Sequence, residues 1–355
     1  MGYDINIRTT EASRLSDTDF SNLAFGKIFT DHMFVADHHD GAWTNARIEP
    51  TGPLPMHPAT SSLHYGQAIF EGLKAYRNVE GEIVIFRPEM NWKRMNKSAD
   101  RMAMPSIPYD LFMGSVERLI DLDRDWVPDS PDASLYIRPF MIATDEFIGV
   151  RTSQNYSFII LLCPVGAYYA KPVKVYASST YTRAFPGGTG AAKVAGNYAA
   201  TLKPANLIHQ KGYDQILWLD GIEHRYLQEI GTMNVFVVID GKVITPTIDE
   251  GTILEGVTRD SAIQLLKEWD IPFEARRIKI DEVIEASRLG TLQEMFGTGT
   301  AATVSHITHV GYQGREHFVS NPDDQAIALR LKEAMQRIKL GQDPDPRGWI
   351  HTLGG

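Results

Sequence analysis

One lysine lies in a stretch whose composition suits chemistry more than packing. Lys193 is the only cation in Pro186-Gly187-Gly188-Thr189-Gly190-Ala191-Ala192-Lys193-Val194-Ala195-Gly196-Asn197-Tyr198, among glycines and other small residues. Glycines allow sharp turns and let a flat ligand approach the backbone closely. An uncharged amine in a partly desolvated pocket can attack an aldehyde and hold it as a Schiff base. Most lysines in glycine-rich loops are surface charges, so this stretch alone leaves both interpretations open.

A carboxylate and a helix start could complete a site around such a lysine. Glu229 lies beside a glycine and between apolar residues in Leu227-Gln228-Glu229-Ile230-Gly231-Thr232-Met233-Asn234, so it could be held inside the protein. Gly256-Val257-Thr258-Arg259-Asp260 precedes a helical pattern, and a helix N-terminus offers N–H groups and a positive dipole end to a phosphate. Glutamates are more often exposed, and many helices start without binding anything, so neither feature decides a function.

Other chemistries fail on their local patterns. Gly297-Thr298-Gly299-Thr300-Ala301-Ala302 fits the G-x-G-x-x-A dinucleotide fingerprint, but the β-branched residues after it predict a strand where that fingerprint needs a helix. A P-loop ending at Lys193 would need glycine where Ala192 stands. His306 and His309 have helical spacing but lie in a predicted strand and loop, and no G-x-S-x-G hydrolase elbow occurs. We therefore expect no metal centre and none of these enzyme classes.

Composition narrows the class of protein further. The 355 residues are 43% hydrophobic, enough for the cores of two domains. The net charge of -9 argues against a nucleic-acid partner, which needs clustered Lys and Arg. Cys163 is the only cysteine, so an intrachain disulfide and a cysteine zinc site are excluded. Met1 to Asp17 has no signal-peptide pattern and no apolar run is long enough to span a bilayer, so we expect a soluble, cytoplasmic protein.

Two groups of elements would have to position these residues. Ser134 to Ile142 and Ser157 to Cys163 are clear strands, and the second is apolar on both faces, so it should be central in a sheet. Further strands and helices are expected at 25–35, 82–86, 89–103, 109–126, 173–178, 198–210, 214–219, 232–240, 242–245 and 323–340. The exposed stretch around Lys171 favours a domain boundary there. The sequence therefore predicts an α/β protein with domains at 1–170 and 171–355.

Several long motifs occur together in one order along the chain. They are LHYGQAIFEGLKAYR, FRPEMNWKRM, SLYIRP, CPVGAYY, GAAKVAGNY, QEIGTMNVF, LEGVTRD and EMFGTGTAA. From about Phe25 to the C-terminal helix, the chain resembles the branched-chain amino acid aminotransferases, which are pyridoxal phosphate enzymes of fold type IV. The resemblance implies a smaller N-terminal α/β domain and a larger C-terminal domain with mixed β-sheets forming a pseudo-barrel.

The resemblance also implies roles in cofactor binding. Lys193 would carry pyridoxal 5'-phosphate covalently and move the proton at the substrate Cα. Glu229 would pair with the pyridine nitrogen, and Tyr198 would contact the phenolic oxygen of the cofactor. The phosphate would be bound by the Arg94 side chain, by main-chain groups of Val257 and Thr258, and by the hydroxyl of Thr300.

The substrate site follows from the same resemblance. Tyr136 and the amides of the loop Thr300-Ala301 would bind the substrate carboxylate, with Arg138 close by. The pocket for the side chain would be shaped by Phe25, Phe70, Tyr168, Tyr198 and Thr232, and a neighbouring subunit of a homodimer would supply Tyr65, Ile148 and Val150. An aromatic pocket favours leucine, isoleucine and valine by apolar burial. The second carboxylate of glutamate or 2-oxoglutarate would pair with Arg138 or a tyrosine hydroxyl.

One departure and three alternatives accompany the resemblance. Longer animal members carry a C-x-x-C pair where this chain has Ala302 and Ser305, so thiol redox control of that kind is not expected. D-amino acid aminotransferase and aminodeoxychorismate lyase share the fold. A third alternative is an inactive binding protein that keeps the pocket, although the intact Lys193 and Glu229 argue against it.

Overall fold

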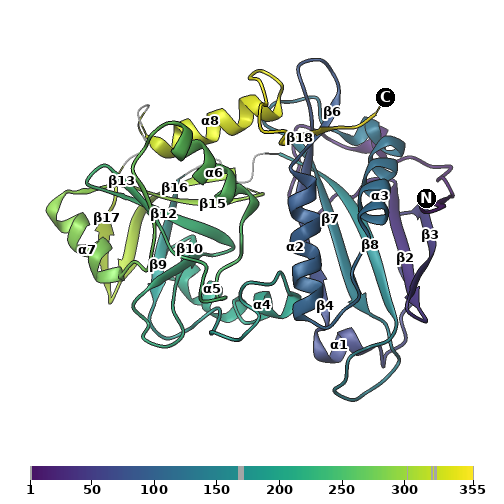
Figure 1. Cartoon of the computed structure of the whole chain (residues 1–355), viewed down its shortest axis with the longest axis horizontal. Coiled ribbons are helices and arrows are strands. Elements are labelled where there is room, and N and C mark those ends of the chain that lie inside the picture. Colours follow the sequence, from purple (N-terminus) through teal and green to yellow (C-terminus); the bar gives the residue numbers. More distant parts are fainter. Residues whose placement is uncertain (1, 167–171, 302, 321–322, 324–325, 355) are drawn as a thin grey trace. The chain divides into compact units, whose positions relative to one another are not determined.

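Residues 2–166, 172–301, 303–320, 323 and 326–354 are described in the computed structural model. The chain forms two compact units, and the elements of each are labelled in Figure 1. The first unit comprises Met1–Tyr168, Ala192–Gly196 and Gln336–Gly355, and the second comprises Tyr169–Ala191 and Asn197–Met335. The short segment with Lys193 thus belongs to the first unit. The domain boundary predicted at 170/171 falls outside the described residues and stays a prediction.

A largely antiparallel sheet forms the first unit. Its strands follow the order β1-β3-β2-β8-β7-β5-β6-β18, and β4 also pairs with β7. Their bounds are β1 Asn6–Ile7, β2 His32–His39, β3 Ala42–Pro50, β4 Ala68–Phe70, β5 Leu73–Arg77, β6 Ile83–Phe86, β7 Ser134–Ala143, β8 Tyr156–Val165 and β18 Ile350–Thr352. The predicted strand at 157–163 is the core of β8 and is central, between β2 and β7.

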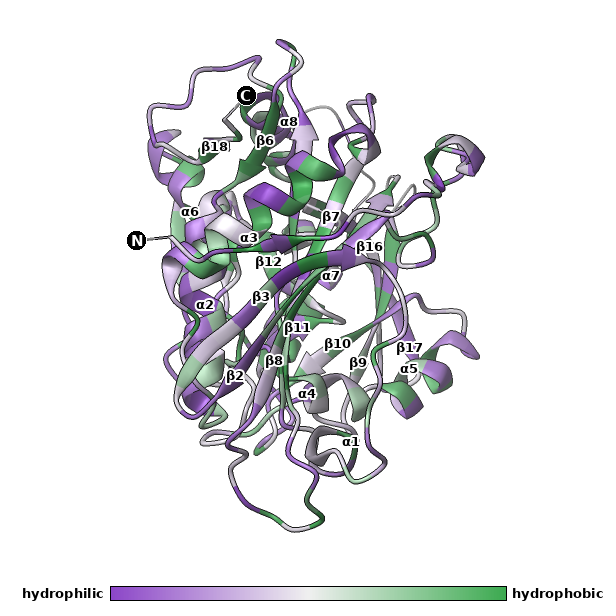
Figure 2. Cartoon of the chain, turned by 90° about the vertical axis from the view of Figure 1, so that its right-hand side faces the viewer, coloured by the Kyte–Doolittle hydropathy of each residue, from purple (hydrophilic) through white to green (hydrophobic). Residues whose placement is uncertain are grey.

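Helices cover one face of this sheet and build its core. They are α1 Ser61–Tyr65, α2 Pro88–Arg101 and α3 Tyr109–Leu122, with short 3-10 turns η1 Leu15–Asp17 and η2 Arg124–Trp126. Phe112 of α3 stacks on Phe158 of β8 with ring centres 6.1 Å apart. Strand β6 is apolar and buried, whereas β3 is mostly hydrophilic and partly exposed, as the hydropathy colours of Figure 2 show.

Side-chain alternation places a second set of residues on the other face of the sheet. Lys74 of β5 pairs in register with Tyr136 of β7, which pairs with Cys163 of β8. Their chain neighbours, such as Leu73 and Ile137, point into the helix-covered core. Because side chains alternate, Lys74, Tyr136 and Cys163 lie on the opposite face of the sheet.

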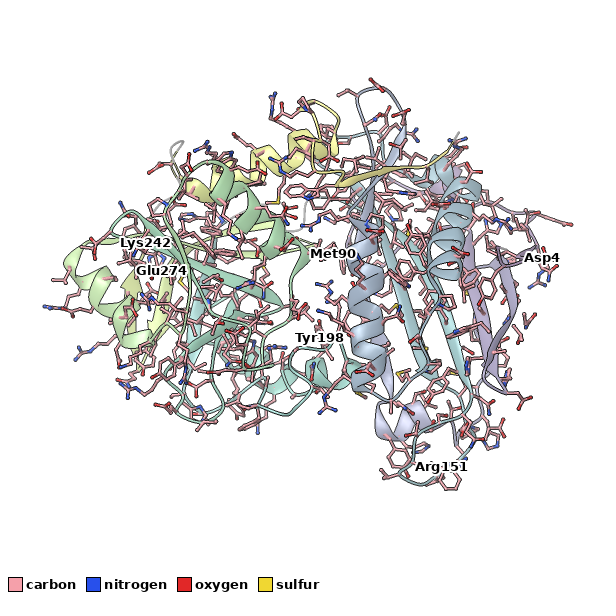
Figure 3. The ribbon with its side chains drawn as sticks, viewed as in Figure 1. Asp4, Met90, Arg151, Tyr198, Lys242 and Glu274 are labelled. Carbon is pink, nitrogen blue, oxygen red and sulfur yellow. The ribbon has the colours of Figure 1, made fainter. Side chains whose placement is uncertain are left out.

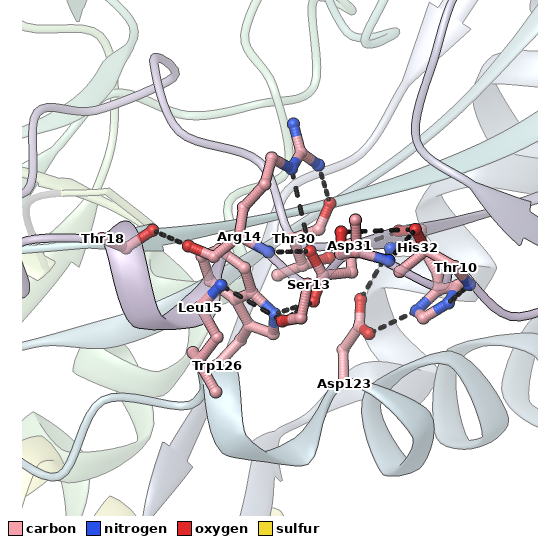
Figure 4. A network of polar contacts seen from close by, with 11 residues as sticks. Thr10, Ser13, Arg14, Leu15, Thr18, Thr30, Asp31, His32, Asp123 and Trp126 are labelled. Carbon is pink, nitrogen blue, oxygen red and sulfur yellow. Dashed lines mark hydrogen bonds and ion pairs between the residues drawn. The ribbon is translucent and has the colours of Figure 1, made fainter.

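A polar network fixes the N-terminal segment to the first sheet (Figure 4). The carboxylate of Asp31 accepts hydrogen bonds from Ser13 Oγ at 2.6 Å and Trp126 Nε1 at 3.0 Å. Burial alone would raise the pKa of Asp31, but these and a backbone hydrogen bond lower it below its usual range. Next to it, His32 Nδ1 lies 2.6 Å from Asp123 Oδ1. The predicted strand at 25–35 therefore begins only at His32, because the residues before it form turns and this network.

The second unit is built around a closed ring of strands. Strands β11, β10, β9, β16, β15 and β12 pair in that order, and pairing of β11 with β12 closes the ring. The bounds are β9 Val173–Ser178, β10 Gln215–Leu219, β11 Leu227–Ile230, β12 Met233–Ile239, β15 Leu292–Gly299 and β16 Thr303–Tyr312. Strand β9 runs parallel to β10 and β16, and the other pairs are antiparallel. This confirms the predicted α/β fold with a mixed pseudo-barrel.

The remaining strands and helices extend this unit, except at one end of two helices. They are β13 Lys242–Thr245, β14 Phe273–Ala275, β17 Arg315–Phe318, α4 Ala195–Ala199, α5 Leu202–His209, α6 Val257–Glu268, α7 Ile280–Leu289 and α8 Ile327–Lys339. Helix α4 begins and α8 ends in the first unit. The helix predicted at 198–210 is two helices, and Pro204 lies in the first turn of α5, where its missing N–H costs no helical bond. Among the described residues, no helix has both the length and the apolar content that a bilayer span requires.

Candidate active site

The backbone at Lys193 is fixed from two sides within the first unit. Its N–H donates to Ser98 Oγ of α2 at 2.9 Å, and its carbonyl accepts the N–H of Phe70 at 3.1 Å. Val194 adds a bridge to Ile69 of β4. The Lys193 Nζ lies 4.8 Å from the centre of the Phe70 ring. The amine is therefore held over an aromatic face by a pinned backbone.

A fully buried carboxylate adjoins this lysine. Glu71, between β4 and β5, accepts hydrogen bonds from Arg94 Nε at 2.7 Å, Arg94 Nη2 at 2.8 Å and Asn91 Nδ2 at 2.8 Å. Burial alone would raise the pKa of Glu71, but the charges of Arg94 and Lys193 and these hydrogen bonds lower it. Glu71 is therefore ionised. The two hydrogen bonds fix the direction of the Arg94 guanidinium, which is the group predicted to contact the phosphate.

Two cations and several aromatic rings lie on the face of the first sheet that carries Tyr136. Arg138 Nη2 donates to the Tyr136 hydroxyl at 2.9 Å, and the Arg138 guanidinium carbon lies 4.6 Å from the Phe70 ring centre. Phe25 packs edge-on against Tyr136 with ring centres 4.9 Å apart. Lys74 lies on the same face, and burial lowers its pKa to about 8. Such a face can bind the carboxylate of a small molecule beside an apolar group.

The second unit holds Glu229 in β11 as a buried carboxylate. Its Oε1 accepts the N–H of Leu254 at 2.8 Å and lies 3.2 Å from Arg183 Nη2. The side chains of Glu229 and Arg183 are 5% and 9% exposed, so water does little to screen this pair. The sequence left both a buried and an exposed position open for Glu229, and the structure shows the buried one.

Helix α6 begins without a side-chain cap. Its N-cap residue is Gly256, and Thr258 in its first turn is buried. A Cβ on Gly256 would lie 2.0 Å from Asn234 Oδ1, so a side chain at this position would displace Asn234. Asn234 in turn donates to the carbonyl of Leu254 at 2.9 Å. The first N–H groups of α6 therefore face no cap from their own N-cap residue, as an anion site requires.

The predicted site residues divide between the units. The first unit holds Phe25, Tyr65, Phe70, Arg94, Tyr136, Arg138 and Lys193, and the second holds Tyr198, Glu229, Thr232, Val257, Thr258, Thr300 and Ala301. Figure 3 labels Tyr198, which lies in α4. Tyr168 lies outside the described residues. Among those residues, no group of three or more His, Cys, Asp or Glu side chains is arranged to hold a metal ion.

Comparison with known proteins connects these features to a family. Residues 68–310 match the family model described as amino-transferase class IV. Branched-chain-amino-acid transaminase 1 of Bacillus subtilis (strain 168) is 47% identical over 336 residues, which cover 93% of this chain and 94% of the relative. The chain is a branched-chain aminotransferase of fold type IV. The D-amino acid aminotransferase and aminodeoxychorismate lyase alternatives are not favoured, because the relatives are branched-chain enzymes.

Solved structures agree with this family. A branched-chain aminotransferase from Thermoproteus uzoniensis, solved with norvaline, superposes with a TM-score of 0.75 at 25% identity, covering 91% of this chain and 100% of that one. A branched-chain aminotransferase of T.th., complexed with N-(5'-phosphopyridoxyl)-L-glutamate, gives a TM-score of 0.72 at 26% identity, with 90% and 98% covered. Class IV aminotransferases use pyridoxal phosphate, and the residues of this branched-chain aminotransferase can be tested against that cofactor.

The donor set fits pyridoxal phosphate. The cofactor needs an amine for its aldehyde, an anion for its ring nitrogen and donors for its phosphate. Groups of each kind are present: the first unit holds the Lys193 amine and the Arg94 guanidinium, and the second holds the buried Glu229 carboxylate and the uncapped start of α6.

Sequence reasoning missed the partners of these groups. Glu71 was visible inside the motif LHYGQAIFEGLKAYR, yet nothing local pairs it with Arg94. Arg183 stands before the glycine-rich stretch and has no pattern of its own. Lys74 lies inside the motif LHYGQAIFEGLKAYR. Strand alternation shows only that it shares a face with Tyr76.

Proposed function

We propose that this branched-chain aminotransferase moves the amino group of L-leucine, L-isoleucine or L-valine to 2-oxoglutarate. The products are the branched-chain 2-oxo acid and L-glutamate, and Lys193 carries the pyridoxal phosphate. One observation carries the proposal: the Phe70 ring centre lies 4.8 Å from the Lys193 amine and 4.6 Å from the Arg138 guanidinium carbon. A reactive amine and a carboxylate-binding cation thus share one aromatic wall.

Four side chains would contact the cofactor, each at a different part of it. When bound, pyridoxal phosphate supplies an electron sink for the pair released at the substrate Cα. Glu229 holds a proton at the ring nitrogen, Tyr198 donates its hydroxyl to the ring oxygen, and Arg94 with the start of α6 binds the phosphate. Lys193 Nζ would take the proton from the substrate Cα and deliver it to the cofactor carbon C4′, on the other side of the substrate nitrogen.

Substrate binding uses the face of the first sheet that carries Tyr136 and Arg138. The Tyr136 hydroxyl and the loop Thr300-Ala301 bind the substrate carboxylate, and the rings of Phe25 and Phe70 bury its aliphatic side chain. The Thermoproteus relative was solved with norvaline, an amino acid whose side chain is of the same apolar kind. A charged side chain without a partner would lose its hydration there, so apolar amino acids are preferred.

The acceptor substrate brings a second carboxylate that needs a cation. Arg138 Nε is buried and has no hydrogen-bond partner within the described part of the chain, so the guanidinium has a donor to offer. Its stacking on Phe70 keeps it at the pocket wall. The relative complexed with a phosphopyridoxyl-glutamate shows that a member of the family accommodates this carboxylate.

The assembly we propose is a homodimer in the cytoplasm. Tyr65, Ile148 and Val150 are 41%, 69% and 90% exposed in the single chain, and a neighbouring subunit would cover these apolar side chains. The single buried cysteine is compatible with a reducing compartment. Sedimentation of the purified protein tests the dimer.

Spectroscopy of the purified protein tests the reaction. L-leucine should remove the visible absorption of the bound cofactor, and 2-oxoglutarate should restore it. Lys193→Ala should abolish this cycle, whereas Lys203→Ala, at an exposed position of α5, should not. Turnover of K193A at the wild-type rate would refute the role of Lys193. D-alanine and aminodeoxychorismate serve as comparison substrates, and a preference for either over L-leucine would refute the proposed substrate class.

A further inference from the structure

Arg183 joins three separate stretches of the second unit. It lies between β9 and the glycine-rich loop, and its Nη2 donates to the carbonyl of Gly190 at 3.0 Å and to the carbonyl of Thr252 at 2.6 Å. The same Nη2 lies 3.2 Å from Glu229 Oε1. One buried guanidinium therefore links the loop before Lys193, the loop before α6 and the carboxylate in β11.

The two carbonyls determine the kind of contact that Arg183 makes with Glu229. An Nη2 nitrogen carries two hydrogens, and the hydrogen bonds to Gly190 and Thr252 use both. The approach to Glu229 is therefore electrostatic, and the lone pairs of the carboxylate are not consumed by the guanidinium. Leu254 N–H provides a hydrogen bond to Oε1 instead.

A buried carboxylate without a neighbouring cation tends to take up a proton. At a ring nitrogen, the carboxylate and the nitrogen compete for one proton, and the group whose ionised form is better stabilised gives the proton away. A fixed positive charge 3.2 Å from Glu229, in a site that water hardly reaches, stabilises the ionised carboxylate. The proton then belongs to the ring nitrogen.

We propose that Arg183 is a positioning residue that keeps Glu229 ionised and aimed, so that the ring nitrogen of the cofactor is held in its protonated form. The inference deepens the proposed function and rests on it, because it assumes that Glu229 pairs with the pyridine nitrogen. Arg183 itself does not touch the cofactor in this arrangement. Its effect should therefore depend on the presence of a ring nitrogen.

A pair of cofactors that differ only at that atom provides the test. The full-length protein is stripped of cofactor and titrated with pyridoxal phosphate and with 1-deazapyridoxal phosphate, which has carbon in place of the ring nitrogen. The wild type should prefer pyridoxal phosphate. In Arg183→Met, the affinity for pyridoxal phosphate should fall about tenfold or more, as loss of a buried charge interaction implies, while that for the deaza analogue changes about twofold or less.

Three controls separate this role from a structural one. Arg225→Met removes a half-exposed arginine of the same unit, and both affinities should stay at the wild-type level. If Arg183→Met does not fold, Arg183→Gln replaces it, because the glutamine amide can still donate to a carbonyl of Gly190 or Thr252 but carries no charge. Equal weakening of both cofactors in the Arg183 variant that folds would overturn the inference and show a role in loop structure alone.

Failure of the underlying function has a different signature. A wild type that binds neither cofactor, or that binds both equally, would contradict the assigned role of Glu229 before Arg183 is considered. A wild type that prefers pyridoxal phosphate, together with an Arg183 variant that keeps the same preference, contradicts only the present inference.

Discussion

Replacing Glu71 by glutamine would leave the charge of Arg94 buried without its carboxylate. Arg94 is 8% exposed in its side chain and Glu71 is fully buried, and the two share hydrogen bonds of 2.7 and 2.8 Å. Removing one partner of such a pair typically costs about 3 to 5 kcal/mol, because the remaining ion has lost its hydration as well as its partner. The glutamine side chain introduced by E71Q can still accept from Asn91, so we expect a loss of about 3 kcal/mol.

Urea unfolding at pH 7.5 measures this loss, with the protein concentration held fixed because a dimer unfolds in a concentration-dependent way. The matched variants are Arg94→Gln and the double variant E71Q/R94Q. Because the double variant buries no unpaired charge, it should be more stable than the sum of the single losses predicts, with a coupling of about 2 kcal/mol or more. Additive losses, or an E71Q loss below about 1 kcal/mol, would refute the idea that this pair is energetically tight.

Acid titration checks the sign of the same interaction. The pKa of Glu71 is lower in the folded chain than its ordinary value of 4.5, so its charge stabilises the fold above that value. The stabilisation is lost as the pH falls through the lower, folded-state pKa. The stability gap between wild type and E71Q should therefore be constant from neutral pH to about pH 5 and shrink below it. A gap that widens on acidification would contradict an ionised Glu71.

Three further perturbations test other parts of the chain. Burial, with a smaller effect of Lys74, lowers the pKa of Lys339 from 10.5 to about 7, so Lys339→Met should gain about 2 to 5 kcal/mol of unfolding free energy at pH 7 and almost none at pH 10.5; equal gains at both would contradict this. Asp31→Ala removes the acceptor for Ser13, so limited proteolysis should cut near residues 13–18 faster than in the wild type, and unchanged cutting would show that the network does not hold this segment. Gly190→Ala places a Cβ 2.5 Å from a backbone oxygen, so pyridoxal phosphate affinity should fall about tenfold or more in an equilibrium titration; wild-type affinity would show that the loop can shift without loss.

Periodicity in the sequence was sufficient for the elements with a continuous apolar pattern. The run Ser157 to Cys163 is apolar at successive positions, and it forms the centre of the first sheet, between β2 and β7. The stretch 25–35 has similar composition, yet it begins with turns, since its polar partners come from elsewhere in the chain. A local pattern cannot show that Asp31 is bound by Trp126, which is far away in sequence.

The charges of the site show where sequence reasoning ends. Residue type and motif identified Lys193, Arg94 and Glu229, because each belongs to a recognisable stretch. Their ionic partners are Glu71, which pairs with Arg94, and Arg183, which pairs with Glu229, and these come from other parts of the chain. A buried ion requires a counter-ion wherever the sheet register brings one, and this register is decided by the apolar faces. A motif can therefore predict which ion is present, while its partner follows only from the folded sheet. For this reason we expect substitutions at Glu71 and Arg183 to alter cofactor binding, although neither residue is predicted to touch the cofactor.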